Sequence, residues 1–195
     1  LNSVIKRLNM IISVINKKGG VGKTPISFSI AKDLGYYLQS NDNSVIESIY
    51  PDMAKISPSP EIIDNCVYDF GGFVSSGVLP ILKESCIILI PTSIDYNSIL
   101  RTVETIEEIQ PYNSNLLIIV TKTEKESDFL SVKEAISQHF ENLEFFELRL
   151  SKAFKNSIET GLSISELYYE TPLSKCAYKS VYQQYTAILE LFKGE

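Results

Sequence analysis

A glycine-rich segment with two lysines and a threonine carries the most specific chemistry in this chain. The segment consists of Lys18, Gly19, Gly20, Val21, Gly22, Lys23 and Thr24. Glycines let the backbone curl until its N–H groups point at one centre, and these amides form an anion site together with the N-terminus of a following helix. In such a loop Lys23 is expected to contact the β- and γ-phosphates of a nucleotide, and the Thr24 hydroxyl is expected to bind Mg²⁺.

The sequence on either side of this segment predicts the elements that position a phosphate loop. The apolar, β-branched run at 11–15 predicts a buried strand before the loop, and residues 26–38 predict a helix after it. Strand, glycine turn and helix is the context that makes a phosphate-loop pattern specific. The general pattern is not complete, because Lys17 stands where its first glycine belongs. An ordinary glycine turn beside a core strand is the alternative interpretation.

Asp69 is the candidate for a second magnesium ligand. It ends the short apolar run at 66–69, and Gly71 and Gly72 follow it. Phosphate-loop ATPases hold Mg²⁺ through water with a carboxylate at the end of a neighbouring strand, which is the position predicted for Asp69. The Gly71 amide is then a candidate sensor of the γ-phosphate. The alternative is an aspartate that only begins a turn, as is common before glycine.

These motifs and their order resemble the ParA/MinD family of partition ATPases. The family's variant loop is K-G-G-x-G-K-T, and residues 18–24 match each of its fixed positions. Lys18 matches the additional lysine that in the family crosses to the nucleotide of a second subunit. The resemblance covers roughly residues 10–192. It implies an ATP-sandwich dimer in which Lys18 and Lys23 take part in catalysis.

The resemblance also implies the ligands and the residues that contact them. The cofactors are ATP and Mg²⁺, and the metal is held by Thr24 and Asp69. The nucleotide-binding residues are Lys18, Gly19, Gly20, Val21, Gly22, Lys23, Thr24, Pro25 and Gly71. Pro25 departs from the family, whose members have Thr or Ser there. Proline offers neither an N–H nor a hydroxyl to the α-phosphate, and one missing charge-assisted hydrogen bond costs roughly 1.5–3 kcal/mol of nucleotide affinity.

A second departure concerns the carboxylate that orients the attacking water. Family members have a D-x-D-P element at the end of the second strand, and its second Asp helps to position the water. We predict the second strand at 45–49, so that Pro51 matches the motif's proline and Ser48 and Tyr50 occupy its Asp positions. Neither side chain is a carboxylate at neutral pH. Asp52 and Glu47 are candidate substitutes, although neither has the expected register.

Strand and helix patterns alternate along the chain, which predicts an α/β fold of the P-loop NTPase type: a mostly parallel sheet with helices on both faces, in a single domain. Further strands are predicted at 86–90 (ended by Pro91), 116–120 and 143–150. Further helices are predicted at 74–82 (interrupted by Pro80), 98–109, 129–140, 153–158 and 175–192. Residues 50–60 contain three prolines and are predicted to form a loop.

Composition restricts the functions that remain. The 195 residues carry a net charge of −6, which argues against nucleic acid binding over the whole surface. Residues 149–195 have six basic and five acidic side chains, and Arg149, Lys152 and Lys155 cluster at their start. These three are the candidate contacts to nonspecific DNA, and a solvated helix end is the alternative. The three cysteines are far apart and there is one histidine, so no metal-ligand spacing is present.

The resulting prediction is a small ParA-like ATPase that dimerises on ATP and acts in plasmid or chromosome partition, through nonspecific DNA and a ParB-like adaptor protein. Residues 1–9 are expected to be an N-terminal extension and 10–195 the ATPase domain. No signal peptide or spanning segment is visible, so a cytoplasmic protein is expected, and DNA binding would associate it with the nucleoid. The alternatives are a nucleotide-binding scaffold that does not hydrolyse ATP and a MinD-like ATPase. The C-terminal residues have too little positive charge to predict membrane attachment.

Overall fold

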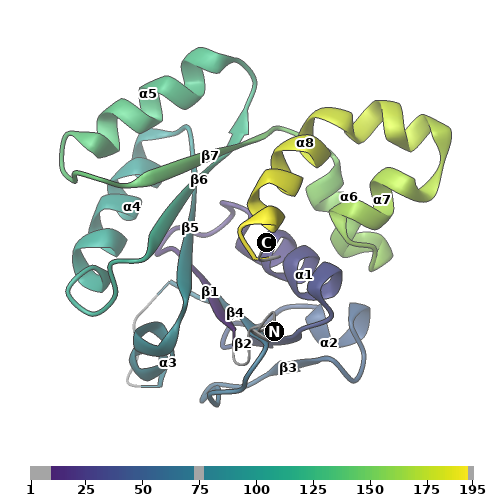
Figure 1. Ribbon diagram of the computed structural model, residues 1–195, viewed down its shortest axis with the longest axis horizontal. Coiled ribbons are helices and arrows are strands. Elements are labelled where there is room, and N and C mark those ends of the chain that lie inside the picture. The colour runs from purple at the N-terminus through teal and green to yellow at the C-terminus, as the bar shows by residue number, and fades with distance from the viewer. Residues whose placement is uncertain (1–9, 73–76, 193–195) are drawn as a thin grey trace, which may run out of the picture.

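The computed structural model describes residues 10–72 and 77–192, and it confirms the predicted α/β architecture with a parallel sheet. Seven strands form one sheet in the order β3-β2-β4-β1-β5-β6-β7, and each adjacent pair is parallel (Figure 1). The strands are β1 (Ile11–Ile15), β2 (Tyr37–Ser40), β3 (Ala54–Ile56), β4 (Cys66–Phe70), β5 (Ile87–Ser93), β6 (Leu116–Thr123) and β7 (Glu144–Arg149).

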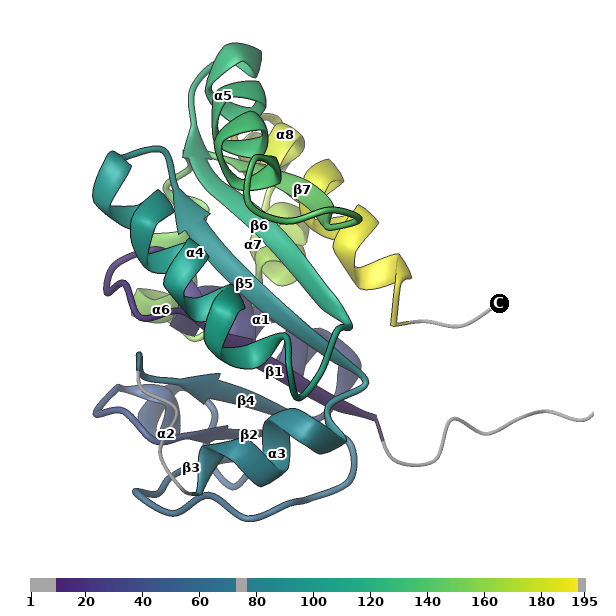
Figure 2. The same ribbon diagram turned by 90° about the vertical axis from the view of Figure 1, so that its left-hand side faces the viewer.

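Helices cover both faces of the sheet. They are α1 (Lys23–Leu34), α2 (Ile46–Ile49), α3 (Val78–Glu84), α4 (Tyr96–Ile109), α5 (Glu126–Ser137), α6 (Ala153–Thr160), α7 (Ile164–Glu170) and α8 (Pro172–Glu190). Helices α3, α4 and α5 lie on one face, whereas α1 and α6 to α8 lie on the other (Figures 1 and 2). Among the described residues, no helix has both the length and the apolar character needed to cross a membrane.

The central strand β1 shows why the sheet is buried on both faces. Ile12 and Val14 point into the hydrophobic core beneath α1, and Ile11 and Ile15 point into the core beneath α3 and α4. Successive side chains of a strand point to opposite faces, so a strand covered on both sides is apolar throughout. The strand's carboxyl end opens into the glycine-rich loop, which therefore lies at the carboxyl edge of the sheet.

The C-terminal end of the helix predicted at 26–38 is wrong. Residues 37–40 form the second strand, so the second strand was predicted too late in the chain. Helix α1 stops at Leu34 because Gly35 takes a left-handed conformation with φ 67°. The N–H groups of Gly35 and Tyr36 bond the carbonyls of Lys32 and Ala31, which is the Schellman ending of a helix. The chain then turns directly into β2, which pairs with β4.

The second strand predicted at 45–49 is also wrong, since these residues form the single turn of α2. Ile46 is buried, and the Ser48 hydroxyl bonds the Val45 carbonyl, as in a helical turn. Residues 50–60, predicted to be a loop, contain the short edge strand β3. Short apolar runs do not distinguish a buried helical turn from a strand, and the stronger strand at 37–40 had been assigned to the preceding helix.

Other predicted elements also differ from the structure, among them β5, α3 and α7. Strand β5 continues through Pro91 to Ser93. The pairing of β5 with β1 ends at Leu89, and the backbone of Pro91 faces the β1 side. The missing N–H of Pro91 therefore costs no hydrogen bond between strands. Helix α3 begins at Val78 and includes Pro80 in its first turn, while residues 73–76 of the predicted helix lie outside the described residues. Helix α7, which had no predicted counterpart, starts with a capping box at Ser163 and Glu166. The predicted extension at 1–9 also lies outside the described residues.

Candidate nucleotide-binding site

The phosphate-loop candidate lies between β1 and α1, as the sequence predicted. Gly20 and Gly22 have φ angles of 77° and 94°, values that favour glycine, and Gly22 caps the N-terminus of α1. Pro25 is the third residue of the helix, where its missing N–H would have had no intrahelical partner. Pro25 is therefore compatible with the fold at the position where it departs from the family pattern.

Thr24 and Asp69 form the centre of the site. The Thr24 hydroxyl donates a 2.7 Å hydrogen bond to Asp69 Oδ2, and the Ser27 hydroxyl lies 3.5 Å from Asp69 Oδ1. Asp69 is buried near the end of β4. Burial raises the pKa of Asp69 to about 6, although the Thr24 hydrogen bond and the charge of Lys23 act in the opposite direction.

These two oxygen donors fit a magnesium ion. Mg²⁺ prefers hard oxygen ligands, and in nucleotide sites it is held by one or two of them together with phosphates and water. Burial disfavours the ionised form of Asp69, and a bound cation would stabilise that form. Thr24 and Asp69 are therefore the residues that would hold the metal.

The Lys23 side chain folds back over the phosphate loop. Its ammonium donates a 3.1 Å hydrogen bond to the Lys18 carbonyl, which closes the loop on itself. Burial lowers the pKa of Lys23, an effect that the carboxylates of Asp69 and Asp42 oppose and the charge of Lys18 reinforces. Lysine at this position can exchange the carbonyl for a phosphate oxygen without moving the backbone.

Asp42 is the carboxylate that the sequence interpretation had missed. Because β2 ends at Ser40, the residues at the end of the second strand are Ser40, Asn41, Asp42 and Asn43, so Asp42 takes the place of the second Asp of the D-x-D-P element. Its side chain packs against Gly71: a Cβ built on Gly71 would lie 3.2 Å from the Cβ of Asp42. The charge of Asp42 also affects the pKa values of Lys23 and Asp69.

The earlier candidates for this role are occupied elsewhere. Tyr50 packs edge-on against Phe28 with ring centroids 5.9 Å apart, and its hydroxyl donates to the Tyr36 carbonyl, at the amino end of β2. The Glu47 carboxylate accepts the Ile56 N–H at 2.8 Å. Asp52 is exposed in a left-handed turn with φ 64°. The proposed register with Ser48 and Tyr50 at the Asp positions is therefore wrong.

The turn after β4 contacts both the β2 loop and the phosphate loop. The Gly71 N–H donates a 2.7 Å hydrogen bond to the Asn41 side chain. A Cβ on Gly72 would lie 2.7 Å from the Cα of Lys17 and 2.8 Å from its carbonyl oxygen, so no larger residue fits without displacing the loop. A shift of Gly72 would therefore displace the Lys17 backbone at the start of the phosphate loop.

Strand β6 contacts the phosphate loop through Thr121 and Lys122, which we call the β6 clamp. The Thr121 hydroxyl lies within hydrogen-bond distance of two carbonyls, those of Val21 at 3.0 Å and Thr92 at 2.9 Å, and the Lys122 ammonium donates to the Gly20 carbonyl at 2.7 Å. Adjacent side chains of a strand normally point to opposite faces. An irregularity in the pairing with β7 between Thr121 and Thr123, with Lys122 at φ 61°, lets both side chains reach the loop.

A pocket of about 190 Å³ opens beside this clamp. Its lining combines apolar groups with basic side chains, and consists of Val21, Gly22, Thr121, Lys122, Leu150, Ser151, Phe154 and Lys155. Continuity with the phosphate loop makes this the candidate pocket for a nucleobase, since ligand sites are mostly apolar with a few polar groups. Leu150 and Phe154 were not among the predicted site residues, because the basic side chains beside them in the sequence indicated a DNA contact and not an apolar pocket.

The three candidate DNA contacts lie around the beginning of α6. Arg149 forms an ion pair with Glu147 at 3.8 Å, and Lys155 forms one with Glu159 at 3.3 Å. Lys152 precedes the first residue of α6 and is exposed. Lys155 also lines the pocket beside the phosphate loop, so one of the three side chains has a second candidate role.

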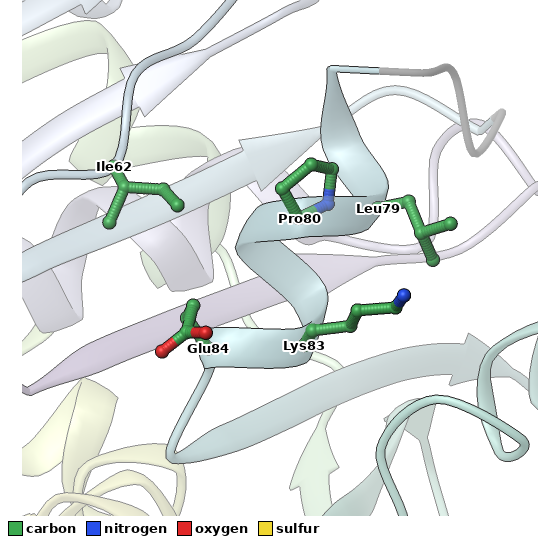
Figure 3. Close-up of a pocket in the computed structure, with 5 residues that line it drawn as sticks. All are labelled: Ile62, Leu79, Pro80, Lys83 and Glu84. Carbon is green, nitrogen blue, oxygen red and sulfur yellow. The ribbon is translucent and has the colours of Figure 1, made fainter.

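Another pocket, of about 420 Å³, lies away from the phosphate loop (Figure 3). It is formed between α3 and the segment before β4, and its lining residues are Ile62, Leu79, Pro80, Lys83 and Glu84. No candidate site residue from the sequence lies in it, and the chemistry described above is confined to the carboxyl edge of the sheet.

Comparisons with known proteins relate this fold to a group of ATPases. No family model and no curated protein sequence matches the chain. Solved structures do match: a protein assigned to plasmid partition in Borrelia burgdorferi B31, with AMPPNP bound, has a TM-score of 0.62 at 13% identity and covers 95% of this chain and 100% of its own.

Two further structures agree with this match. MinD from Aquifex aeolicus has a TM-score of 0.61 at 14% identity, covering 89% of this chain and 95% of its own. A ParA family ATPase from Chlorobium tepidum TLS has a TM-score of 0.61 at 15% identity, covering 89% and 99%. This chain therefore has the fold of the ParA/MinD ATPases. At these identities the likeness shows the fold, and function must be argued from the site.

Proposed function

We propose that this chain is a ParA-like ATPase that binds ATP with Mg²⁺ and dimerises when it does so. The proposal is carried by one observation: Lys23, Thr24 and Asp69 converge at the carboxyl edge of the sheet, where the Thr24 hydroxyl and Asp69 carboxylate are 2.7 Å apart. Its support is the match of residues 18–24 to the variant loop and the fold shared with nucleotide-bound ATPases.

The residues divide the work of phosphoryl transfer between them. Backbone amides of Gly19 to Thr24 bind phosphate oxygens, and Lys23 neutralises charge on the β- and γ-phosphates. When bound, Mg²⁺ supplies charge neutralisation between the phosphates, held by Thr24 and Asp69. Lys18 crosses to the nucleotide of a second copy. Little covalent chemistry is required of the protein, so positioning and electrostatics account for most of the catalysis.

Asp42 completes this set as the residue that orients the attacking water. It is exposed to solvent, lies against Gly71 and is close enough to Lys23 to affect its pKa. The hypothesis of a scaffold without hydrolysis depended on the loss of this carboxylate, so it loses its main support. The Gly71 N–H is held by Asn41, and contact with the γ-phosphate requires it to exchange that bond.

The proposed task is partition of a plasmid or chromosome, with nonspecific DNA and a ParB-like adaptor protein as partners. The supports are the family resemblance and the cluster of Arg149, Lys152 and Lys155 on an otherwise acidic chain. Phosphate contacts of this type are independent of sequence and sensitive to salt. The dimer would bring two such clusters into one assembly.

The test is a comparison of the wild-type protein with Lys23→Ala and Lys18→Ala. Calorimetry with a non-hydrolysable ATP analogue and Mg²⁺ should give binding in the wild type and in Lys18→Ala, and none in Lys23→Ala. Light scattering should show an analogue-dependent dimer in the wild type and a shift toward monomer in Lys18→Ala. Lys55→Ala, which removes an exposed lysine of β3, is the matched control and should behave as the wild type.

Two results would contradict the proposal. Wild-type affinity in Lys23→Ala would remove the phosphate loop from nucleotide binding. A strict monomer at high protein concentration, with the analogue demonstrably bound, would contradict the sandwich dimer while leaving nucleotide binding intact.

A further inference from the structure

Helix α4 carries a row of polar side chains on the face that it turns toward the sheet. Thr102 and Thr105 are 0% and 1% exposed, and Glu108, which is partly exposed at the edge of this face, follows one turn later. A helix that packs on a buried sheet is expected to present apolar residues there, and buried polar groups are retained only where they find hydrogen-bond partners. We call Thr102, Thr105 and Glu108 the α4 polar stripe.

The partners of this stripe are the residues that lead into the phosphate loop. Thr102 Oγ1 accepts a 2.8 Å hydrogen bond from the Asn16 side chain, and Thr105 Oγ1 accepts a 3.2 Å bond from the Lys17 N–H. Glu108 forms a 2.8 Å ion pair with the Lys17 ammonium. Three successive turns of α4 thus hold two successive residues of the loop.

The two threonine hydroxyls are oriented for this purpose by the helix itself. Thr102 Oγ1 donates to the Ser98 carbonyl at 2.8 Å, and Thr105 Oγ1 donates to the Arg101 carbonyl at 2.6 Å. A hydroxyl has one proton, and once the helix carbonyl takes it, only lone pairs remain for the loop. Both hydroxyls therefore act as fixed acceptors.

Asn16 transmits this arrangement to Lys18. Asn16 is fully buried, donates to the Pro91 carbonyl as well as to Thr102, and accepts the Lys18 N–H at 2.8 Å. Its amide can donate twice and both donors are used, so it has one orientation. Asp95, at the N-terminus of α4, is also close enough to Lys18 for the lysine charge to lower its pKa, after its bonds from Ser98 and Ser93.

We propose that the α4 polar stripe positions Lys18, and that Thr105 is a positioning residue for the nucleotide-dependent reaction. The inference rests on the proposed function, because Lys18 matters only if a nucleotide is bound. The backbone of Lys17 lies between Thr105 on one side and Gly72 on the other. Thr105 therefore helps to fix the position of the Lys17 backbone relative to the turn that follows Asp69.

The experiment compares Thr105→Val with Thr105→Ser. Valine has the shape of threonine without an acceptor, whereas serine retains the hydroxyl. Thr186→Val is the matched control, because Thr186 makes the same bond to a helix carbonyl in another helix, α8. Amide hydrogen exchange of residues 16–18 should accelerate in Thr105→Val alone, in the protein without nucleotide.

The functional arm measures ATP affinity and single-turnover hydrolysis on the same variants. Affinity should change less than about twofold, and hydrolysis should fall about five- to tenfold in Thr105→Val, with recovery in Thr105→Ser. A residue that acts through Lys18 should have no further effect once Lys18 is removed. Thr105→Val combined with Lys18→Ala should therefore match Lys18→Ala alone.

The outcomes separate the inference from the proposed function. Unchanged hydrogen exchange in Thr105→Val would overturn the contact, and faster exchange with wild-type hydrolysis would overturn the positioning role. An additive loss in the double variant would show that Thr105 acts independently of Lys18, which also overturns the inference. A wild-type protein that binds no nucleotide would overturn the proposed function, and the positioning role with it.

Discussion

Asp42 is the side chain whose placement most changes the chemistry expected of the site. Its position follows from the end of β2 at Ser40, which the glycine at 35 determines by ending α1. The loop residues 18–24 lie between β1 and α1 and Asp69 lies near the end of β4, as expected from the sequence, because their spacing is local and the glycines are distinctive. Asp42 was not, because its role depends on which of two nearby segments becomes the strand, and the apolar run at 45–49 looked the stronger candidate.

Removal of the Asp42 charge should slow hydrolysis without removing nucleotide binding. We expect Asp42→Asn to reduce single-turnover hydrolysis by about ten- to a hundredfold, because water positioning is lost, while ATP affinity stays within about threefold. Asp52→Asn is the matched control, an exposed aspartate with the same chemical change. Loss of hydrolysis in Asp52→Asn or Glu47→Gln, with Asp42→Asn active, would restore the register that we rejected.

At the scale of elements, α4 begins with a strong N-terminal cap. Asp95 accepts the Ser98 N–H at 3.0 Å and the hydroxyls of Ser98 and Ser93 at 2.6 and 2.7 Å. These hydrogen bonds lower the pKa of Asp95 to about 2. The folded-state pKa is below the unfolded value, so the stabilisation is present above about pH 4 and is lost as the pH falls toward 2.

Asp95→Ala should therefore destabilise the protein by about 1–2 kcal/mol at pH 7, as loss of a helix cap does. The difference from the wild type should shrink as the pH is lowered from 4 toward 2. Urea unfolding at several pH values measures both effects. Asp95→Asn keeps an acceptor oxygen without a titrating charge, and its stability difference from Asp95→Ala should not depend on pH. A wild-type advantage that is constant with pH would contradict this account.

Elements with strong patterns were predicted best. The amphipathic helix α4 and the apolar strands β1, β4 and β6 lie close to where the sequence placed them. Errors occurred where tertiary pairing overrides local pattern. Pro91 remains in β5 because its neighbour β1 has already ended, which no local property of the sequence reveals. Gly35, in contrast, is a glycine of the kind that ends helices, and hydrophobic periodicity alone does not indicate this end.

At the scale of the whole molecule, the acidic chain carries the basic cluster of Arg149, Lys152 and Lys155 near the candidate nucleotide-binding site. The ion pair of Lys155 with Glu159 is exposed, and such pairs are worth little in water. The Arg149 side chain is also exposed, although its partner Glu147 is partly buried, so both cations remain able to contact phosphates. Dimerisation would double the number of contacts. The fold class could be read from the alternation of strands and helices, but the surface could not, since the sequence does not place charges on a face.

Replacement of Arg149, Lys152 and Lys155 by glutamate should abolish ATP-dependent DNA retention. The salt dependence of wild-type binding should be steep, because each phosphate contact releases a counterion. The control replaces Lys55, Lys125 and Lys179 by glutamate, which makes the same change in net charge at exposed positions elsewhere. ATP affinity must be measured in parallel, because Lys155 lines the pocket beside the loop. Unchanged DNA retention in the first variant would place the DNA site elsewhere.

The clamp from β6 has a consequence for the field inside the loop. A peptide unit is planar and trans, so its C=O and N–H point in opposite directions. Lys122 and Thr121 hold the carbonyls of Gly20 and Val21 from outside, and the N–H groups of the next residues, Val21 and Gly22, are thereby turned away from β6. Two side chains that contact the loop only through its carbonyls thus help to orient two peptide dipoles. The orientation of the loop's peptide dipoles thus depends partly on side chains of β6, a strand about one hundred residues further along the chain.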